Sequence, residues 1–227
     1  MKDSILENIK TISIIGGTGK EGKGLAVRWA QAGYRIVIGS RIAEKAENAA
    51  NEILALMDGK GDVVGKENPI AAQEADLAVL TVPFAAHTSM LESLKPFLQG
   101  KILIDVTVPL VPPKVSKVQM PPAGSAAQEA QQILGENVSV VAAFQNISYE
   151  NLLEGGDVDC DILVCGVTKE AREVVLALVK EAGLIGWDAG PIENSVVVEG
   201  MTSILIGINK KYGVTSSGIR ITGVNRD

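Results

Sequence analysis

Side chains that commonly carry acid–base, nucleophilic or metal chemistry are scarce in this sequence of 227 residues. The two cysteines, Cys160 and Cys165, lack the C-x-x-C spacing and the histidine partner of a metal site. They lie an odd number of residues apart in a strand-like segment, so their side chains are expected on opposite faces, which argues against a disulfide. No Ser-His-Asp set, paired carboxylates or metal-ligand spacing stands out elsewhere. We therefore expect no metal site and little acid–base machinery.

Long hydrophobic runs and an excess of positive charge are also missing. No segment reaches the ~20 apolar residues that a membrane-spanning helix needs. The polar start of the chain, residues 1–8, does not resemble a signal peptide. The formal net charge is −6, which argues against a general surface for nucleic acids or anionic membranes. We expect a cytoplasmic protein with no nucleic-acid or membrane partner, in which local basic groups hold any anionic ligand.

Alternating strand and helix patterns dominate the chain. Aromatic residues are few (4%), whereas apolar residues reach 46% and glycines number 24, a composition typical of α/β layers. The alternation predicts a doubly wound parallel sheet with right-handed crossovers. A Rossmann domain is expected over residues 1–150, with a smaller C-terminal part over 151–227 that completes the sheet. The expected strands are Thr11–Ile15, Tyr34–Gly39, Asp62–Gly65, Leu77–Thr81, Lys101–Val106, Ser139–Ala143 and Asp161–Cys165. The expected helices are Lys20–Ala32, Ala43–Met57, Pro69–Glu74, Ala86–Phe97, Gly124–Leu134 and Lys169–Ala182.

The segment Asn194–Tyr212 has the pattern of a long helix with apolar residues on most sides. A helix that is apolar all round needs burial on more than one face. We expect it to pack on the Rossmann domain and on a partner subunit, which predicts a homodimer. The residues that follow, Ser216–Gly223, are expected to form a short strand or an ordered tail.

A glycine-rich turn follows the first expected strand. Gly17, Gly19 and Gly22 form the pattern G-x-G-x-x-G between a strand and a helix, the order that a dinucleotide-binding fingerprint requires. Gly17 then permits the tight turn, Gly19 lets the backbone approach a pyrophosphate, and Gly22 lets the helix pack on the strand. Free N–H groups and the helix dipole favour phosphate at the helix start. The alternative is an ordinary strand-to-helix turn that binds nothing, and the flanking elements favour nucleotide binding.

The end of the second expected strand lacks the acidic residue that usually binds the ribose 2′-hydroxyl of NAD. It reads Ser40-Arg41, and the next carboxylate along the chain is Glu44. A hydroxyl and a guanidinium group bind a 2′-phosphate, which a carboxylate would repel. Lys45 can add a second positive charge from the following helix. These residues predict NADP(H) rather than NAD(H), against the alternative that Arg41 is an ordinary solvated surface residue.

Two loops are expected to meet at the carboxyl edge of the sheet. Thr81–Phe84 ends the fourth strand, and a loop with five prolines between residues 109 and 122 follows the fifth. Ligands of open α/β sheets bind outside the carboxyl ends of the strands. The loops are therefore expected to flank a nicotinamide ring. The interpretation that they only connect secondary-structure elements has equal weight.

The single histidine, His87, follows the first of these loops. It is a candidate general base, as in dehydrogenases of hydroxy acids, but a hydrogen-bonded structural residue suits its place at a helix start, and we favour that interpretation. Hydride transfer between two organic cofactors requires little proton transfer by the protein. Positioning alone can contribute ~7–11 kcal/mol in favourable cases, and the cofactors supply the reactive chemistry.

Several stretches taken together resemble the NADPH-dependent coenzyme F420 reductases, also called F420H2:NADP+ oxidoreductases. The resemblance runs from Ile12 to Val224. Its most specific stretches are Gly16-Gly17-Thr18-Gly19, Gly22-Lys23-Gly24, Gly39-Ser40-Arg41, Ala78-Val79-Leu80-Thr81-Val82-Pro83, Val164-Cys165-Gly166, Asp188-Ala189-Gly190-Pro191 and Gly218-Ile219-Arg220-Ile221-Thr222-Gly223.

The resemblance implies hydride exchange between C4 of the nicotinamide and C5 of the deazaflavin F420, with the rings stacked. It implies the following cofactor contacts: Thr18, Gly19, Lys20 and Glu21 at the NADP pyrophosphate; Ser40, Arg41 and Lys45 at the 2′-phosphate; Val82, Phe84 and Val108 at the nicotinamide, with Tyr149 nearby; and Thr202 with the backbone near Ser217 at the deazaflavin. The C-terminal part is expected to complete the F420 site and the dimer interface, and no residue is assigned a catalytic role.

The chain departs from the family pattern at three positions. Archaeal members typically have a histidine where this chain has Gln145, an arginine at Val196 and a serine at Gly200. A positive charge for the acidic tail of F420 is therefore missing. Lys210, Lys211 and Arg220 are candidate substitutes, although solvated basic residues near a C-terminus are the default interpretation.

Two other functions remain open from the sequence. One is an NADPH-dependent reductase of a small imine, ketone or metal chelate, with His87 or Tyr149 as proton donor. The other is a non-catalytic NADP(H) sensor. The same Rossmann half serves all three functions.

Overall fold

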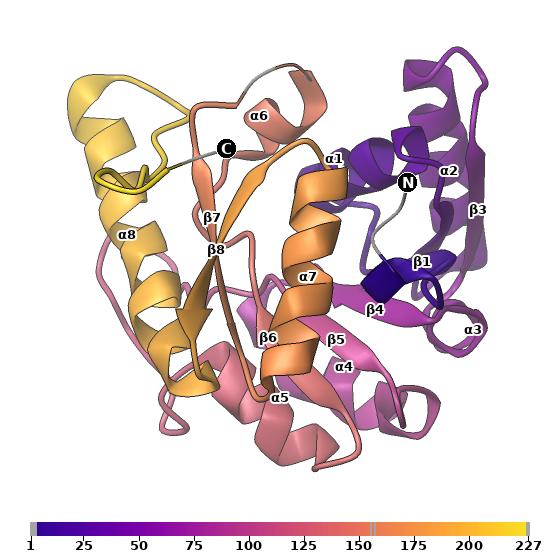
Figure 1. The fold of residues 1–227 in the computed structure, drawn as a ribbon, viewed down its shortest axis with the longest axis horizontal. Coiled ribbons are helices and arrows are strands. Elements are labelled where there is room, and N and C mark those ends of the chain that lie inside the picture. Colours follow the sequence, from indigo (N-terminus) through magenta and orange to yellow (C-terminus); the bar gives the residue numbers. More distant parts are fainter. Residues whose placement is uncertain (1–3, 155, 157, 226–227) are drawn as a thin grey trace.

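A single eight-stranded sheet forms the centre of the protein, seen in a computed structural model that describes residues 4–154, 156 and 158–225. The strand order is β3-β2-β1-β4-β5-β6-β7-β8 (Figure 1). The strands are β1 (Thr11–Ile15), β2 (Arg35–Ser40), β3 (Asp62–Glu67), β4 (Leu77–Leu80), β5 (Ile102–Asp105), β6 (Ser139–Ala142), β7 (Asp161–Gly166) and β8 (Ile185–Gly190). The α-helices are α1 (Lys20–Gln31), α2 (Ala43–Leu56), α3 (Asn68–Glu74), α4 (His87–Leu94), α5 (Ala126–Leu134), α6 (Tyr149–Glu154), α7 (Lys169–Glu181) and α8 (Ser195–Tyr212). Short 3-10 turns are η1 (Ser4–Leu6), η2 (Phe84–Ala86), η3 (Lys95–Phe97) and η4 (Ile192–Asn194).

Helices cover both faces of the sheet, and each face has its own hydrophobic core. Successive side chains of a strand point to opposite faces. Within β1, Ile14 therefore packs with residues of α1, α2 and α7, whereas Ile15 packs with residues of α3, α4 and α5. Figure 1 shows α8 at the outer edge of the molecule, where it contacts α5. The doubly wound fold predicted from the sequence is confirmed.

The expectation of a wholly parallel sheet is wrong at one place. Strand β7 runs antiparallel to β6, with Ala142 opposite Cys165. The intervening chain does not cross the sheet but forms α6, which packs against α1. A strand that starts at the edge where its neighbour ends must run in the opposite direction. The sheet is therefore mixed but mostly parallel, and it continues through the boundary expected near residue 150.

The C-terminal tail is ordered by a buried carboxylate and forms no strand in the described residues. The main-chain N–H of Asp161 donates to the carbonyl of Ile219 at 2.8 Å, and the N–H of Ile221 donates to Asp161 Oδ2 at 2.8 Å. Trp187 Nε1 donates to the same oxygen at 2.8 Å. These bonds fix the tail beside β7, which brings the residues just before it to the carboxyl edge of the sheet.

Helix α8 is attached to α5 by a second buried carboxylate, Glu199. It accepts hydrogen bonds from the main-chain N–H groups of Ala126 at 2.7 Å and Ala127 at 3.1 Å. Burial raises the pKa of Glu199 to about 8, and the two N–H donors oppose that rise. Ser195 and Ser125 share a further buried hydrogen bond of 2.7 Å between their hydroxyls. These hydrogen bonds fix the position of α8 relative to α5 and the sheet.

Two smaller features complete the description. Cys160 and Cys165 are buried free thiols. Within the described ranges, none of the helices has the length and apolar character needed to cross a membrane.

Candidate functional site

The turn between β1 and α1 is too tightly packed to accept side chains at most of its glycines. Gly16 has φ +71°, and a Cβ there would lie 2.6 Å from Val82 Cγ1. A Cβ on Gly17 would lie 2.7 Å from the carbonyl oxygen of Ile14, and one on Gly22 would lie 2.8 Å from the Cα of Gly17. Nothing lies within 4 Å of the same position on Gly19. The turn is therefore closed on its inner side and open at Gly19.

Gly19 is also the N-cap of α1, and no side chain caps this helix. The first N–H groups of a helix have no intrahelical partner and must bond to a cap, to water or to a ligand. The N-terminus of α1 thus offers unsatisfied donors and the positive end of the helix dipole to the open space beside Gly19.

A pocket of about 290 Å³ lies between this turn and the basic residues that follow β2. Arg41 and Lys45 line it together with the hydroxyl residue Ser40. The remaining lining residues are Gly16, Thr18, Ile42, Asn68, Val82, Pro83, Ala86, Ser89 and Met90. No carboxylate belongs to this set of described residues, so the pocket suits an anion.

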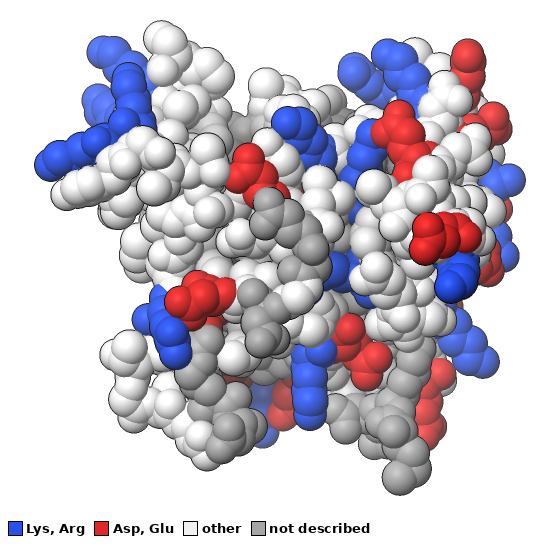
Figure 2. Space-filling view, turned by 90° about the horizontal axis from the view of Figure 1, so that it is seen from above, with Lys and Arg blue, Asp and Glu red and all other residues white. Residues whose placement is uncertain are grey.

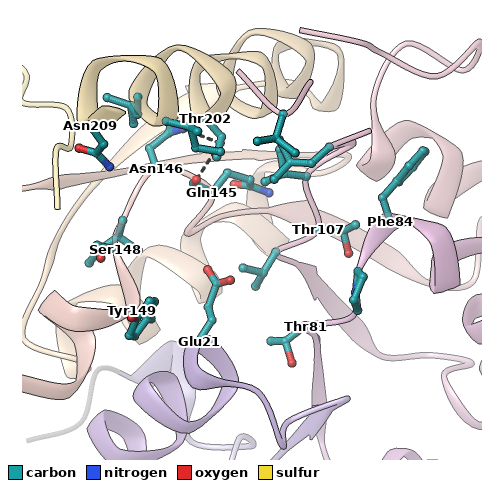
Figure 3. A pocket seen from close by; sticks show the side chains of 18 of the residues that line it. Glu21, Thr81, Phe84, Thr107, Gln145, Asn146, Ser148, Tyr149, Thr202 and Asn209 are labelled. Carbon is teal, nitrogen blue, oxygen red and sulfur yellow. Dashed lines mark hydrogen bonds between the residues drawn. The ribbon is translucent and has the colours of Figure 1, made fainter. Parts of the chain in front are cut away.

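A larger pocket of about 620 Å³ lies on the other side of Val82 and Pro83, which line both pockets. Its walls come from Glu21, Thr81, Val82, Pro83, Phe84, Ala85, Val106, Thr107, Val108, Leu110, Pro112, Val115, Gln145, Asn146, Ile147, Ser148, Tyr149, Thr202, Leu205, Ile206, Asn209, Thr215 and Ser217 (Figure 3). Both loops expected to meet at the carboxyl edge of the sheet contribute. The two pockets adjoin at the point where the strand order reverses, between β1 and β4.

Amide groups form one wall of the larger pocket. Gln145 Nε2 donates to the carbonyl of Asp105 at 2.7 Å, and Asn146 Nδ2 donates to the carbonyl of Val198 at 2.9 Å. The hydroxyl of Thr202 donates to the carbonyl of Gln145 at 2.8 Å, which ties α8 to this wall. The amide oxygens of Gln145 and Asn146 are buried and accept no hydrogen bond within the described chain. They are available to accept from N–H or O–H groups of a ligand.

Tyr149 lines one side of the larger pocket and is hydrogen-bonded to Lys20 at the start of α1. Lys20 Nζ donates to the hydroxyl of Tyr149 at 3.0 Å, and this hydrogen bond raises the pKa of Lys20. The Tyr149 hydroxyl donates to Glu150 Oε1 at 3.3 Å, and Glu150 Oε2 accepts from the hydroxyl of Thr215. The start of α1 is thereby linked through α6 to the C-terminal tail.

Glu21 lies in the wall of the larger pocket, where Figure 3 shows its side chain pointing from α1 into the cavity. Burial raises its pKa to about 8. The family resemblance implies a place for Glu21 beside the pyrophosphate. Glu21 lies in the first turn of α1, and its carboxyl group points into the larger pocket on the side of Gln145 (Figure 3).

His87 lies behind the pockets and is fully buried. Its Nε2 is 2.8 Å from Asp105 Oδ2 and its Nδ1 is 3.1 Å from Glu129 Oε1. Burial lowers the pKa of His87, but the hydrogen bonds to the two carboxylates outweigh this effect and leave its pKa raised. The main-chain N–H of Thr107 donates to the other Asp105 oxygen at 3.0 Å. His87 thus holds Asp105, and Asp105 positions a loop that lines the larger pocket.

The remaining predicted site residues divide between these features. The smaller pocket brings together Thr18, Ser40, Arg41 and Lys45, and the larger brings together Phe84, Val108, Tyr149, Thr202 and Ser217. Gly17, Gly19, Lys20 and Gly22 line neither pocket and form the turn and helix start near both. Sequence reasoning missed Asn68 and Met90 in the smaller pocket and Asn146, Leu205 and Asn209 in the larger. The spacing of Thr202, Leu205 and Asn209, which places them on one helix face, could have indicated the α8 positions.

The basic side chains near the C-terminal end of α8 differ in whether they are paired with a carboxylate. Arg220 is paired with Asp159 at 2.8 Å. Lys210 and Lys211 occupy the last turn of α8, and Figure 2 shows basic side chains gathered on this side of the molecule, at the left of the view. Asn209, which directly precedes them in the chain, lines the larger pocket.

Comparison with known proteins identifies close relatives. The family model for NADP oxidoreductases, coenzyme F420-dependent, matches residues 11–109. The F420-dependent NADP reductase of Methanocaldococcus jannaschii is 42% identical to this chain, in an alignment that covers 94% of this chain and 98% of the relative. That of Methanothermobacter thermautotrophicus is 41% identical, covering 95% and 96%. In fold, the crystal structure of a candidate F420-dependent NADP reductase from Arthrobacter sp. FB24 is similar with a TM-score of 0.78, at 23% identity, covering 94% of this chain and 99% of that one.

The two glycines of the turn are expected to respond differently to alanine. Gly19→Ala adds a methyl group to open space, so the melting temperature should fall little while NADPH binding weakens at least tenfold, because the methyl group blocks the approach of phosphate. Gly22→Ala forces a methyl group against Gly17, so it should lower the melting temperature clearly. Thermal unfolding and NADPH fluorescence titration measure both effects. Unchanged NADPH affinity in Gly19→Ala would contradict a phosphate site at this turn.

Proposed function

The chain belongs to the F420-dependent NADP reductase family, and we propose that its two adjoining pockets hold the two substrates of that enzyme. The protein is an oxidoreductase that transfers a hydride between NADP(H) and coenzyme F420. In our assignment the smaller pocket holds the adenosine end of NADP(H) with its 2′-phosphate. The nicotinamide lies at the junction formed by Val82 and Pro83, and the deazaflavin of F420 occupies the larger pocket.

The residues of the smaller pocket fit a 2′-phosphate. Arg41 supplies a planar guanidinium donor, Lys45 a second positive charge and Ser40 a hydroxyl, and no carboxylate opposes them among the described lining residues. The uncapped start of α1 and the open space at Gly19 fit a pyrophosphate between the two pockets. The single observation that carries the assignment is that Val82 and Pro83 line both pockets, because a dinucleotide must span both.

The residues of the larger pocket fit a planar heterocycle with polar edges. Val82, Phe84 and Val108 provide apolar surface, and the free amide oxygens of Gln145 and Asn146 provide acceptors at one wall. Thr202 and Ser217 lie on the side formed by α8 and the tail. This combination of apolar walls and a few placed polar groups is typical of cofactor sites.

The protein's contribution to hydride transfer is positioning and exclusion of water. The reaction exchanges one hydride between C4 of the nicotinamide and C5 of the deazaflavin. The Val82 and Phe84 side chains hold one ring from the sheet side, and α8 covers the opposite side through Thr202 and Leu205. Holding two reactants in contact can contribute ~7–11 kcal/mol to lowering the barrier in favourable cases. The acidic tail of F420 is assigned to Lys210 and Lys211, since Arg220 already has a carboxylate partner.

We further propose that the enzyme is a homodimer that joins through α8. Val197, Ile204 and Ile208 on this helix are 64%, 50% and 38% exposed, and Val118 from the proline-rich loop is 44% exposed beside them. Exposed apolar residues gathered on one helix favour a protein interface. We also place the enzyme in the cytoplasm, which its two free thiols support.

Mixing the enzyme with NADPH and oxidised F420 is expected to bleach the visible absorbance of the deazaflavin. NADH should drive the same change at least tenfold less efficiently, because it lacks the phosphate that Arg41 and Lys45 are assigned to bind. NADPH binding without any F420 reduction would contradict the assignment of the larger pocket to F420. The protein would then be tested against small imines, ketones and metal chelates.

Arg41→Glu places a carboxylate beside the proposed 2′-phosphate. Loss of a charge-assisted hydrogen bond and added repulsion should raise the KM for NADPH ~100-fold, while the KM for NADH changes less than threefold. The matched control is Lys60→Glu, an equal charge change on an exposed residue outside both pockets. An equal loss for NADPH and NADH would contradict the role assigned to Arg41.

Ile204→Glu places a charge on the exposed face of α8 and should convert the dimer to a folded monomer in analytical ultracentrifugation. Leu56→Glu, which changes an exposed leucine on α2, serves as the control and should remain dimeric. A wild-type monomer, or a dimer that survives Ile204→Glu, would contradict this interface.

A further inference from the structure

Glu21 is the only carboxyl residue among the described residues that line the larger pocket. These described lining residues include no histidine, lysine or arginine, and Tyr149 is the one ionisable side chain among them besides Glu21. Glu21 comes from the first turn of α1, next to the proposed pyrophosphate site, and its side chain extends into the cavity (Figure 3). It therefore lies between the positions proposed above for the two substrates.

Within the described part of the chain, the Glu21 carboxyl group has neither a hydrogen-bond partner nor a counterion, and burial alone raises its pKa to about 8. The neighbouring Lys20 does not neutralise it, because Lys20 donates to Tyr149. A carboxyl group without a partner in a pocket of low polarity favours its neutral form. At neutral pH Glu21 thus holds a proton that it can donate into the cavity.

The overall reaction requires such a proton. Reduction of F420 by NADPH consumes one proton in addition to the hydride, because a hydride carries two electrons but only one hydrogen nucleus to the acceptor. The amide, hydroxyl and aliphatic groups of the pocket do not release protons near neutral pH. Positioned acids commonly supply protons in such reactions.

We propose that Glu21 is the proton donor of the NADPH-to-F420 reaction, an inference that rests on the pocket assignment under Proposed function. The C4–H bond of the nicotinamide breaks and its electron pair forms the C5–H bond of the deazaflavin. The O–H bond of Glu21 breaks, and its proton forms an N–H bond on the reduced deazaflavin. NADPH is oxidised, F420 is reduced, and Glu21 is left as a carboxylate facing a positively charged nicotinamide. Water then returns the proton to Glu21.

The same arrangement gives the two directions of the reaction opposite pH dependences. F420 reduction needs protonated Glu21, so its rate should fall about tenfold per pH unit above the Glu21 pKa. NADP+ reduction needs the carboxylate, so its rate should rise with pH up to that pKa. Because the overall reaction consumes a proton, the ratio of the two rates changes with pH in any case. The feature that identifies Glu21 is the break in each profile at its pKa, which a residue that only shapes the pocket does not produce.

Glu21→Gln keeps the shape of the side chain and removes the proton. We expect kcat for F420 reduction at pH 7 to be ~100-fold lower in this variant, which is the lower end of the contribution usual for a positioned acid. The decrease of kcat above pH 8 that is expected for the wild type should be absent from its pH profile. Glu170→Gln changes an exposed glutamate in the first turn of α7 and should behave as wild type. Glu21→Leu provides a second variant without a proton, and melting temperatures verify that all three variants fold.

Proton uptake on nucleotide binding tests the proposal without turnover. The phosphates of NADPH raise the pKa of a carboxyl group beside them, so wild type and Glu170→Gln should take up protons near pH 8 when NADPH binds. NADP+ should cause less uptake because its nicotinamide is cationic. An indicator dye in weak buffer measures this difference, which should be absent in Glu21→Gln.

Two outcomes are distinguishable. F420 reduction by Glu21→Gln with the wild-type rate, pH profile and proton uptake would overturn the donor role and leave the proposed function intact. No F420 reduction by the wild-type enzyme, despite NADPH binding, would overturn the proposed function and the donor role with it.

Discussion

The close approach of α1 to the end of β1 determines the rest of the site. Gly22 lies so near Gly17 that the methyl group of an alanine would not fit between them. This contact holds the uncapped N-terminus of α1 at the point where the strand order reverses. Gly16 brings the same turn against Val82, which lines both pockets together with Pro83. Backbone contact, which only glycine permits, therefore fixes the positions of the α1 N-terminus, the loop of Val82 and Glu21 relative to one another.

Buried carboxylates hold the other walls. One oxygen of the Asp105 carboxylate is hydrogen-bonded to His87, and the other accepts from the main-chain N–H of Thr107. The main-chain carbonyl of Asp105 accepts from the Gln145 side chain. Glu199 attaches α8 to the start of α5, and Asp161 fixes the C-terminal tail. Each of these carboxyl groups has hydrogen-bond donors, as burial of a polar group requires. Glu21 differs from them because it projects into the cavity with no donor, which is the property expected of a group that exchanges a proton with a substrate.

Most of the fold could be predicted from the sequence, because segments rich in β-branched residues alternate with helix-forming segments and glycines lie at the turns between them. This is the pattern of a doubly wound sheet. The sequence also predicted the basic end of the smaller pocket, since Ser40 and Arg41 stand directly at a strand end. The antiparallel β7, by contrast, depends on how α6 folds back against α1, which local patterns do not encode. Asn146 and Asn209 lie far apart in sequence, and only tertiary packing brings them to one cavity. The direction in which the Glu21 side chain points into the larger pocket likewise follows from packing and not from its position in the motif.

In the proposed arrangement the rings of the two substrates meet directly where the larger pocket opens at Val82 and Pro83, shielded from water. Deuterium at one face of C4 of NADPH tests this most directly, by mass spectrometry of the reduced F420. The account predicts that one of the two stereospecifically labelled forms passes its deuterium intact to C5 of the deazaflavin, and that the other passes none. Loss of the label to solvent, or equal transfer from both forms, would contradict direct contact between fixed rings.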